Sequence, residues 1–219
     1  MEILYIAHSS FLVTAKNGAK ILFDPYDPEG YGDSLKYVPY CGEADAVCVS
    51  HSHPDHRCLK FVQGNPTVFD KPGSYTFGDI KIKGIETDHD ENGGAQRGKS
   101  IVFVLEIEGM TLAHLGDLGR KLTPAELKEI GKTDIVLVPV GGYFTIDAAT
   151  AEEVVADLGA KVIIPMHFST PWCSFPIGPV EDFTNRILNV VRLGVTRFEP
   201  TDIPASPSVL VLEPSHVLK

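Results

Sequence analysis

The chain has 219 residues, of which 43% are hydrophobic and 22% are charged, as in ordinary globular proteins. Acidic residues outnumber basic ones by 29 to 19, and this excess argues against a nucleic-acid-binding surface. The balance does not exclude a small-molecule substrate that is anionic and is held by one or two local cations.

The N-terminal segment and the cysteines favour a cytoplasmic protein. The segment MEILYIAHSSFLV is apolar but has no cationic start, so we interpret it as a strand and not as a signal peptide. No apolar run approaches the length of a membrane span. The four cysteines form no C-x-x-C pair and are expected to be reduced thiols. We therefore expect no membrane partner, while the oligomeric state is left open.

The first half of the chain predicts short strands joined by tight turns. Asn17-Gly18, Gly78-Asp79 and Glu108-Gly109 separate apolar runs and favour hairpins. Residues 24–42 are rich in Gly, Pro and Tyr and predict a long loop, which is often a functional feature. The predicted strands are Glu2–Ile6, Phe11–Thr14, Lys20–Phe23, Ala46–Ser50, Val68–Phe69, Ser74–Phe77, Lys81–Glu86, Ser100–Ile107 and Met110–His114.

In the second half, helices begin to alternate with the strands. Thr123, Pro124 and Glu126 form a capping-box pattern that predicts a helix start. The predicted helices are Pro124–Ile130, Ala148–Leu158 and Val180–Leu193, and the strands are Asp134–Val138, Lys161–Pro165, Thr196–Phe198 and Val209–Leu212. This pattern predicts a layered α/β fold, in one domain over residues 1–219.

The segment HSHPDH directly follows the predicted strand Ala46–Ser50. In an extended segment His51 and His53 point to the same side, whereas Asp55 and His56 follow the turn at Pro54. One short peptide can therefore supply ligands to two adjacent metal ions. Imidazole with carboxylate suits zinc, manganese or iron, and the alternative of a polar loop with surface histidines fits the combined motif less well.

Three further metal-capable residues follow predicted strands: His89, Asp117 and His167. Taken singly, Asp117 also fits a turn cap and His167 a buried core histidine. Together with HSHPDH they place such residues at four strand ends, which a layered fold brings to one edge.

These motifs, in this order, resemble the metallo-β-lactamase fold superfamily. The segments HSSFLV, LFDP, HLGDLG, PVGGYFTID and IIPMHF resemble its branch of Zn-dependent hydrolases, which includes proteins similar to L-ascorbate-6-phosphate lactonase. The resemblance covers nearly the whole chain and specifies no substrate. It implies a single-domain, four-layer αββα sandwich with its site at one edge.

The resemblance also implies a ligand set for two divalent metal ions, with zinc favoured and manganese or iron as alternatives. His51, His53 and His89 would hold one ion, Asp55, His56 and His167 the other, and Asp117 would bridge them. Asp24, in LFDP, would support the metal loop. His114 is a competing imidazole three residues before Asp117, and the acidic neighbours of His89 depart from other branches of the family.

The expected activity is a metal-dependent hydrolase in which a metal-bound hydroxide at a dinuclear site cleaves a small ester, lactone or phosphoester. Asp55 would both bind metal and orient the hydroxide, and His8 or His114 are candidate proton donors to the leaving group. The alternatives are a mononuclear iron thiol dioxygenase on the same fold and a non-catalytic metal-binding protein.

Two segments that follow strands are expected to form the substrate walls. They are Gly141–Phe144 and Ser169–Phe175. The substrate-binding residues expected within them are Gly142, Tyr143 and Trp172, although Trp172 also fits a packing role. Arg97 and Lys99 lie in or next to the Gly-rich stretch 93–98 and are candidates for binding an anionic group, although a solvated flexible loop is the favoured interpretation.

Overall fold

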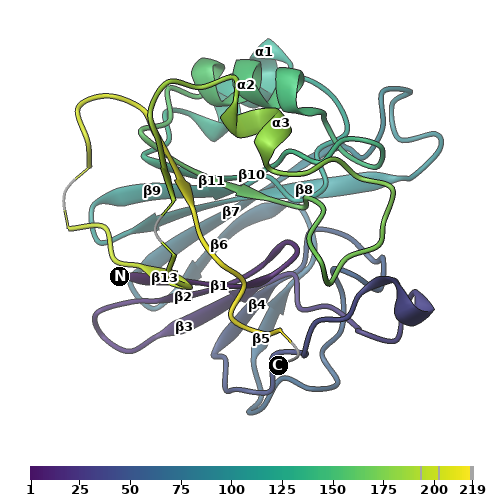
Figure 1. The fold of residues 1–219 in the computed structure, drawn as a ribbon. Coiled ribbons are helices and arrows are strands. Elements are labelled where there is room, and N and C mark those ends of the chain that lie inside the picture. Colours follow the sequence, from purple (N-terminus) through teal and green to yellow (C-terminus); the bar gives the residue numbers. More distant parts are fainter. Residues whose placement is uncertain (193, 202, 218–219) are drawn as a thin grey trace.

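Two β-sheets pack face to face, with helices on the outer side of one of them (Figure 1). The computed structural model describes residues 1–192, 194–201 and 203–217. Within these residues the smaller sheet has six strands. In spatial order they are β13 (Arg197–Phe198), β1 (Glu2–Ala7), β2 (Ser10–Thr14), β3 (Lys20–Phe23), β4 (Ala46–Cys48) and β5 (Thr67–Phe69).

The larger sheet has eight strands among the described residues and changes from antiparallel to parallel pairing at β9. The hairpin strands predicted from the turn residues form its antiparallel part, and the strands that alternate with helices form its parallel part. In spatial order the strands are β12 (Val190–Arg192), β14 (Ser208–Val211), β11 (Val162–Met166), β10 (Ile135–Pro139), β9 (Met110–His114), β8 (Lys99–Ile107), β7 (Ile80–Asp88) and β6 (Gly73–Phe77).

The main core lies between the two sheets. Phe11 and Phe23 of the smaller sheet and Phe103 and Leu137 of the larger one are fully buried in it. Leu22 belongs to a different cluster, on the outer face of the smaller sheet, because successive side chains of a strand point to opposite faces. Apolar residues at consecutive positions of β3 therefore indicate a strand that is covered on both sides.

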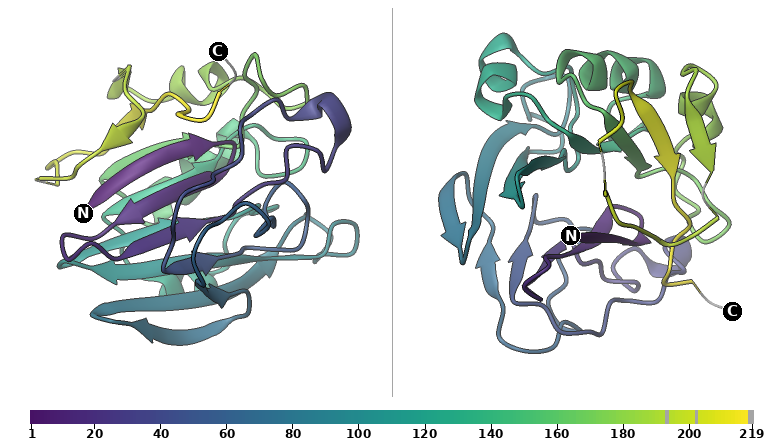
Figure 2. Two further views of the ribbon diagram at one scale, coloured as in Figure 1. Left: turned by 90° about the horizontal axis from the view of Figure 1, so that it is seen from below. Right: turned by 90° about the vertical axis from the view of Figure 1, so that its left-hand side faces the viewer.

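The α-helices lie on the far side of the larger sheet, as the right-hand view of Figure 2 shows. They are α1 (Pro124–Ile130), α2 (Ala148–Asp157) and α3 (Glu181–Thr184). The predicted capping box of α1 is confirmed: Thr123 Oγ1 accepts from Glu126 N at 3.3 Å, and the Glu126 carboxylate accepts from Thr123 N at 2.7 Å. None of the described helices is long and apolar enough to span a membrane.

The outer face of the smaller sheet is covered by the loop of residues 24–42, which carries the 3₁₀ turn η1 (Gly32–Ser34). Tyr26, Leu35 and Tyr37 of this loop are buried there. Tyr26 Oη donates to Val38 O at 2.6 Å, which satisfies the phenol within the apolar cluster. The predicted metallo-β-lactamase sandwich is confirmed, and its fourth layer is built mainly from this loop.

The predicted helix Val180–Leu193 is wrong beyond its first turn. Helix α3 ends at Thr184, and the chain then enters β12, an edge strand that pairs in parallel with β14. The predicted end at Leu193 lies outside the described residues. The β-branched Val190 and Val191 fit a pleated strand, and pairing with β14 outweighs the apolar spacing that had suggested a helix.

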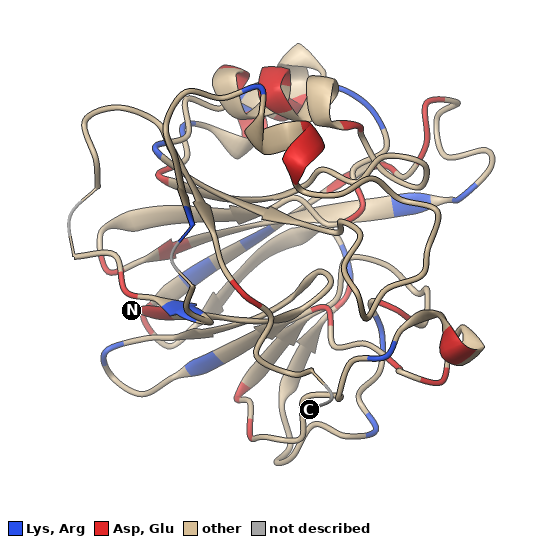
Figure 3. Cartoon of the chain, in the orientation of Figure 1, with Lys and Arg blue, Asp and Glu red and all other residues tan. Residues whose placement is uncertain are grey.

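Charged residues of both signs are mixed over the described surface (Figure 3). Several of them form exposed pairs across neighbouring elements, such as Lys81 with Glu106 and Arg186 with Glu152. Exposed pairs of this kind contribute little to stability. The absence of a nucleic-acid partner stays a prediction.

Candidate metal centre

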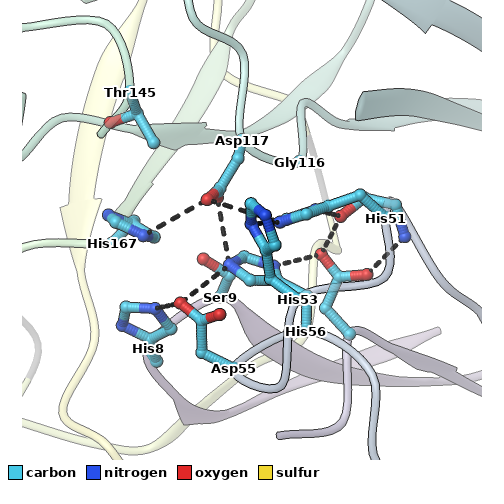
Figure 4. A network of polar contacts seen from close by, with 12 residues as sticks. His8, Ser9, His51, His53, Asp55, His56, Gly116, Asp117, Thr145 and His167 are labelled. Carbon is cyan, nitrogen blue, oxygen red and sulfur yellow. Dashed lines mark hydrogen bonds and ion pairs between the residues drawn. The ribbon is translucent and has the colours of Figure 1, made fainter. Parts of the chain in front are cut away.

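Five strand ends deliver polar side chains to one edge of the sandwich (Figure 4). The HSHPDH segment follows β4, and the other side chains follow β7, β9, β11 and β1. The structure therefore brings all seven predicted ligands together, and it adds His8 to them. These ligands are His51, His53, Asp55, His56, His89, Asp117 and His167.

One group of imidazoles consists of His51, His53 and His89. Their ligand atoms lie within 4.8 Å of one another. His51 Nε2 and His53 Nδ1 face each other at 2.9 Å, and the His89 ring lies 4.7 Å from the His51 ring between centroids. This is the set that was predicted for the first ion.

A second group consists of Asp55, His56 and His167, together with His8. His8 Nε2 lies 3.2 Å from Asp55 Oδ2, and the His8 and His167 rings are 4.2 Å apart between centroids. All four residues are buried. The set predicted for the second ion is thus gathered at one point, with one additional imidazole.

Asp117 lies between the two groups, and its carboxylate contacts imidazoles of both. Its Oδ2 is 3.3 Å from His89 Nε2 and 3.5 Å from His167 Nε2, while its Oδ1 is 3.1 Å from His56 Nε2. Burial would raise the pKa of Asp117, but the imidazoles of His167 and His56 hold it well below its ordinary value. An ionised carboxylate in this place can serve two cations at once.

The glycines of the HLGDLG segment allow Asp117 to reach this position. Gly116 has φ +54°, and a Cβ there would lie 2.8 Å from Ser50 Cβ. A Cβ at Gly119 would lie 2.2 Å from Asp90 N, so only glycine fits against the segment that carries His89. Gly116 therefore permits the close approach of the Asp117 loop to Ser50, and Gly119 permits its approach to the segment that carries His89.

Asp24 and Ser50 orient one imidazole from each group. Asp24 Oδ2 accepts from Ser50 Oγ at 2.6 Å and lies 2.8 Å from His56 Nδ1, and Ser50 Oγ lies 2.9 Å from His51 Nδ1. Because Ser50 gives its proton to Asp24, it accepts from His51 Nδ1, and His56 Nδ1 donates to Asp24. Both Nε2 atoms are then free of protons in the neutral rings and point into the site.

The chain is in the left-handed region at His8 and at His167, with φ of 56° and 52°. His167 N donates to His8 O at 3.0 Å, so the two turns that end β1 and β11 hold each other. Such conformations are uncommon for residues other than glycine, and they cluster at functional sites. Here they place two imidazoles side by side at the second group.

Unpaired polar atoms in the site fit a bound cation. Among the described residues, four buried atoms make no hydrogen bond: His56 Nε2, His167 Nε2, Asp55 Oδ1 and Asp117 Oδ1. His56 Nε2 and Asp117 Oδ1 lie 3.1 Å apart, a contact that is an ion pair only if the His56 ring is protonated. Buried polar atoms are rarely left in this state, because each costs about 1–3 kcal/mol. A divalent ion shared by imidazole nitrogens and carboxylate oxygens would satisfy them.

His114 is a core histidine and not a ligand in this arrangement. Its Nε2 lies 2.8 Å from Ser9 O, and its Nδ1 accepts from Gly116 N at 3.1 Å, so both ring nitrogens are used. The ring stacks on Phe23 with centroids 4.9 Å apart. The same contacts leave it no proton to give to a leaving group.

A cavity of about 200 Å³ opens over the two groups, and its walls differ in part from those predicted. Its lining residues are Tyr31, His53, Asp55, His89, Arg97, Asp117, Phe144 and Phe175. Of the three predicted substrate residues, Tyr143 lines a neighbouring cavity of about 640 Å³, and Gly142 and Trp172 line neither. Trp172 packs instead in the cluster under the loop of residues 24–42.

Sequence reasoning left the places of His8 and Tyr31 open. Within the two predicted wall segments it singled out Gly142, Tyr143 and Trp172, whereas Phe144 and Phe175 of the same segments line the cavity. His8 carries the same signal as the other ligands, a histidine directly after an apolar strand. Phe144 and Phe175 lie in the two segments expected to form walls, but nothing in the sequence distinguishes them from Tyr143 and Trp172. Their positions depend on how the loops pack.

The metal-free protein is expected to lose stability as the pH falls below about 6.5. Burial keeps the pKa of His51 and of His167 down at about 3, despite the nearby Asp117 carboxylate. The unfolded chain takes up these protons below about 6.5 and the folded protein does not, which costs about 1.4 kcal/mol per pH unit for each group.

The elevated pKa of His8 does not offset this loss. Burial would lower it, but the hydrogen bond with Asp55 raises it to about 9, so its contribution is already complete below pH 6.5. Urea unfolding of chelator-treated protein at pH 7, 6 and 5 measures the effect. Equal unfolding free energies at the three pH values would contradict it.

Comparison with known proteins agrees with this geometry. Residues 2–167 match the beta-lactamase superfamily domain. UPF0173 metal-dependent hydrolases from Carboxydothermus hydrogenoformans and Alkaliphilus metalliredigens are 32% and 34% identical, over 83% and 81% of this chain and 91% and 87% of theirs.

A solved structure shows the same relationship. It is that of a proposed Zn-dependent hydrolase of the metallo-β-lactamase superfamily from Thermotoga maritima. It is 42% identical to this chain, with a TM-score of 0.82 over 97% of this chain and 98% of the other. The chain therefore belongs to the β-lactamase superfamily and, within it, to the family of metal-dependent hydrolases that these relatives represent.

Proposed function

We propose that the protein hydrolyses a small ester, lactone or phosphoester at a centre of two divalent metal ions. One observation carries the proposal: two groups of ligand atoms flank a single buried carboxylate, Asp117. A mononuclear site would need only one of these groups. The unpaired nitrogen and oxygen atoms in the site support the same conclusion.

In this proposal His51, His53 and His89 hold one ion, and Asp55, His56 and His167 hold the other, with Asp117 shared. Zinc is favoured by the mixture of imidazoles and carboxylates, and manganese and iron are compatible with it. When bound, two such ions lower the pKa of a water molecule from 15.7 to about 7 and stabilise the negative charge that develops on a cleaved carbonyl or phosphoryl group.

The protein residues position these reactants and exclude water. Asp55 has one oxygen against His8 Nε2 at 3.2 Å, while its Oδ1 has no hydrogen-bond partner among the described residues. We assign Asp55 to orient the attacking water, and His8 to fix the Asp55 carboxylate. Phe144 and Phe175, whose rings lie 5.7 Å apart, narrow the cavity above the site and limit its hydration.

Metal analysis of protein purified without added metal tests the proposal. We expect two zinc or manganese ions per chain, together with hydrolysis of at least one compound in a panel of lactones, phosphodiesters and thioesters. His53→Ala should lower both metal content and activity. One iron per chain would favour the thiol dioxygenase instead, and a metal-free protein would contradict a metal-dependent activity.

A further inference from the structure

The cavity over the two groups of metal ligands has a polar floor and mainly aromatic walls. Its floor is formed by His53, Asp55, His89 and Asp117, and its walls by Tyr31, Arg97, Phe144 and Phe175. Three of the wall residues are aromatic, and Arg97 is the one cationic side chain among all the lining residues. A substrate that enters the cavity therefore meets one fixed positive charge beside the metal groups.

Arg97 differs from the other cations nearby in having no carboxylate partner. In the part of the chain that the structure describes, Arg120 pairs with Asp88 and Glu126, but no ion pair is found for Arg97. Its guanidinium lies over the Phe144 ring, 5.5 Å from the centroid, so both residues are held at the cavity wall. Arg97 therefore keeps its hydrogen-bond donors available for a ligand.

The loop that carries Arg97 is organised around Asp90, the residue after His89. The buried Asp90 carboxylate accepts from four backbone nitrogens of the loop, including Arg97 N at 2.8 Å. His89 N also donates to Gly98 O at 3.1 Å. The Arg97 backbone is thereby tied to the residue that follows His89, although most residues of the loop are exposed, as the interpretation of a solvated loop expects.

The charge balance of a metal-loaded site favours an anion next to Arg97. The Asp55 and Asp117 carboxylates and the ionised Asp24 carboxylate against His56 contribute three negative charges, whereas two divalent ions would contribute four positive ones. The floor of the cavity is then net positive, and Arg97 adds a further charge in a confined space of about 200 Å³. Cations and walls of low dielectric constant together concentrate anionic ligands.

We propose that Arg97 binds an anionic group of the substrate, a carboxylate or a phosphate, next to the bond that is cleaved. This inference rests on the proposed hydrolase function and narrows its substrate class to anionic esters, lactones or phosphoesters. The planar guanidinium presents two parallel donors to a carboxylate or phosphate, which a lysine ammonium cannot do. Arg97 is thus a specificity residue, and Asp90 is its positioning residue.

Two esters that share a leaving group test the proposal on metal-loaded protein. They are neutral 4-nitrophenyl acetate and the mono-4-nitrophenyl ester of succinic acid. Arg97→Ala should lower kcat/KM for the succinate ester by about 10- to 100-fold, the loss typical of a charged hydrogen bond, and leave the acetate ester nearly unchanged. Arg97→Lys should give an intermediate kcat/KM for the succinate ester, because lysine keeps the positive charge but lacks the two parallel donors of the guanidinium.

Lys99→Gln is the matched control. It removes one positive charge from the same loop, but Lys99 pairs with Asp88 and does not line the cavity. Its kinetics should resemble those of the wild type with both esters. Equal losses for the two esters in Arg97→Ala, or no loss, would overturn the proposal.

A binding measurement separates this inference from the proposed function. Calorimetric titration of metal-loaded protein with inorganic phosphate and with succinate needs no turnover, and it shows which of the two anions is preferred. Arg97→Ala should lower the affinity for the preferred anion about tenfold or more, at unchanged metal content. If the wild type cleaves no ester of any class, the proposed function fails, whereas unchanged anion affinity in Arg97→Ala refutes the role of Arg97 alone.

Discussion

Replacement of Asp117 by Asn should reduce hydrolysis on the order of a thousandfold or more, which is the loss expected when a central charged group is removed from a catalytic site. Asp117 contacts His56, His89 and His167 and so joins both groups of ligands. Asn keeps the volume but removes the negative charge that balances two cations. The variant should also bind fewer than two metal ions per chain.

Paired measurements of kcat/KM and metal content check this result. Asp134→Asn is a suitable control, because the Asp134 carboxylate accepts from Thr111 N and does not line the cavity above the metal groups. It should keep its metal and its activity. An Asp117→Asn enzyme that retained two ions and activity within about tenfold of the wild type would show that the bridge is assigned to the wrong residue.

The ligand set could be predicted because most of it obeys local rules. His51, His53, Asp55 and His56 are contiguous, and the strand before them is a plain apolar run. His89, Asp117 and His167 each follow a strand, and the edge of a layered fold collects such positions. His8 obeys the same rule, but a single histidine near the N-terminus offers no second signal to support it.

The cavity walls could not be predicted in the same way, because they depend on contacts between distant loops. Tyr31 and Phe175 are far apart in sequence, yet their rings meet edge to face with centroids 5.4 Å apart. Arg97 faces the cavity only because Asp90 folds its loop back. The residue types that form such Asx-type contacts indicate a turn, but they do not indicate where a side chain of that turn points.

The fold shows the same division between local and distant determinants. The strands Lys20–Phe23 and Met110–His114 and the helix Pro124–Ile130 were predicted with their observed bounds, since Asn-Gly, Glu-Gly and a capping box mark their ends. The error at Val190–Arg192 arose because an edge strand is defined by its partner β14. Such a partner, nearly twenty positions later, is not visible in the pattern of the segment itself.

Asp24→Asn should weaken metal binding about 10- to 100-fold without unfolding the protein, the usual effect of losing a residue that orients metal ligands. The Asp24 carboxylate accepts from Ser50 N, Ser50 Oγ and His56 Nδ1. Asn replaces one of the two carboxylate oxygens by an NH₂ group. At that position the NH₂ group then faces a donor of Ser50 or His56, and two donors cannot form a hydrogen bond. If His56 changes tautomer to relieve this, its Nε2 carries the proton and cannot bind a metal ion.

Asp24→Ala should in addition destabilise the metal-free protein by about 3–5 kcal/mol, because it leaves buried donors of Ser50 and His56 without a partner. Burial would raise the pKa of Asp24, but His56 holds it below its ordinary value, so the carboxylate is ionised at neutral pH and its removal leaves a charge imbalance. Urea unfolding in chelator separates this loss from the stabilisation that bound metal provides.

The two Asp24 variants together distinguish orientation from simple stability. If Asp24 acts by fixing tautomers, Asn should lose metal affinity while keeping most of the unfolding free energy, and Ala should lose both. Asp27→Asn, in the same loop, should lose neither, because among the described residues the Asp27 carboxylate accepts only from Glu29 N and the backbone bonds of Asp27 are unchanged. Full metal affinity in Asp24→Asn would mean that the histidines are oriented by packing alone, without the proton order that Asp24 imposes through Ser50 and His56.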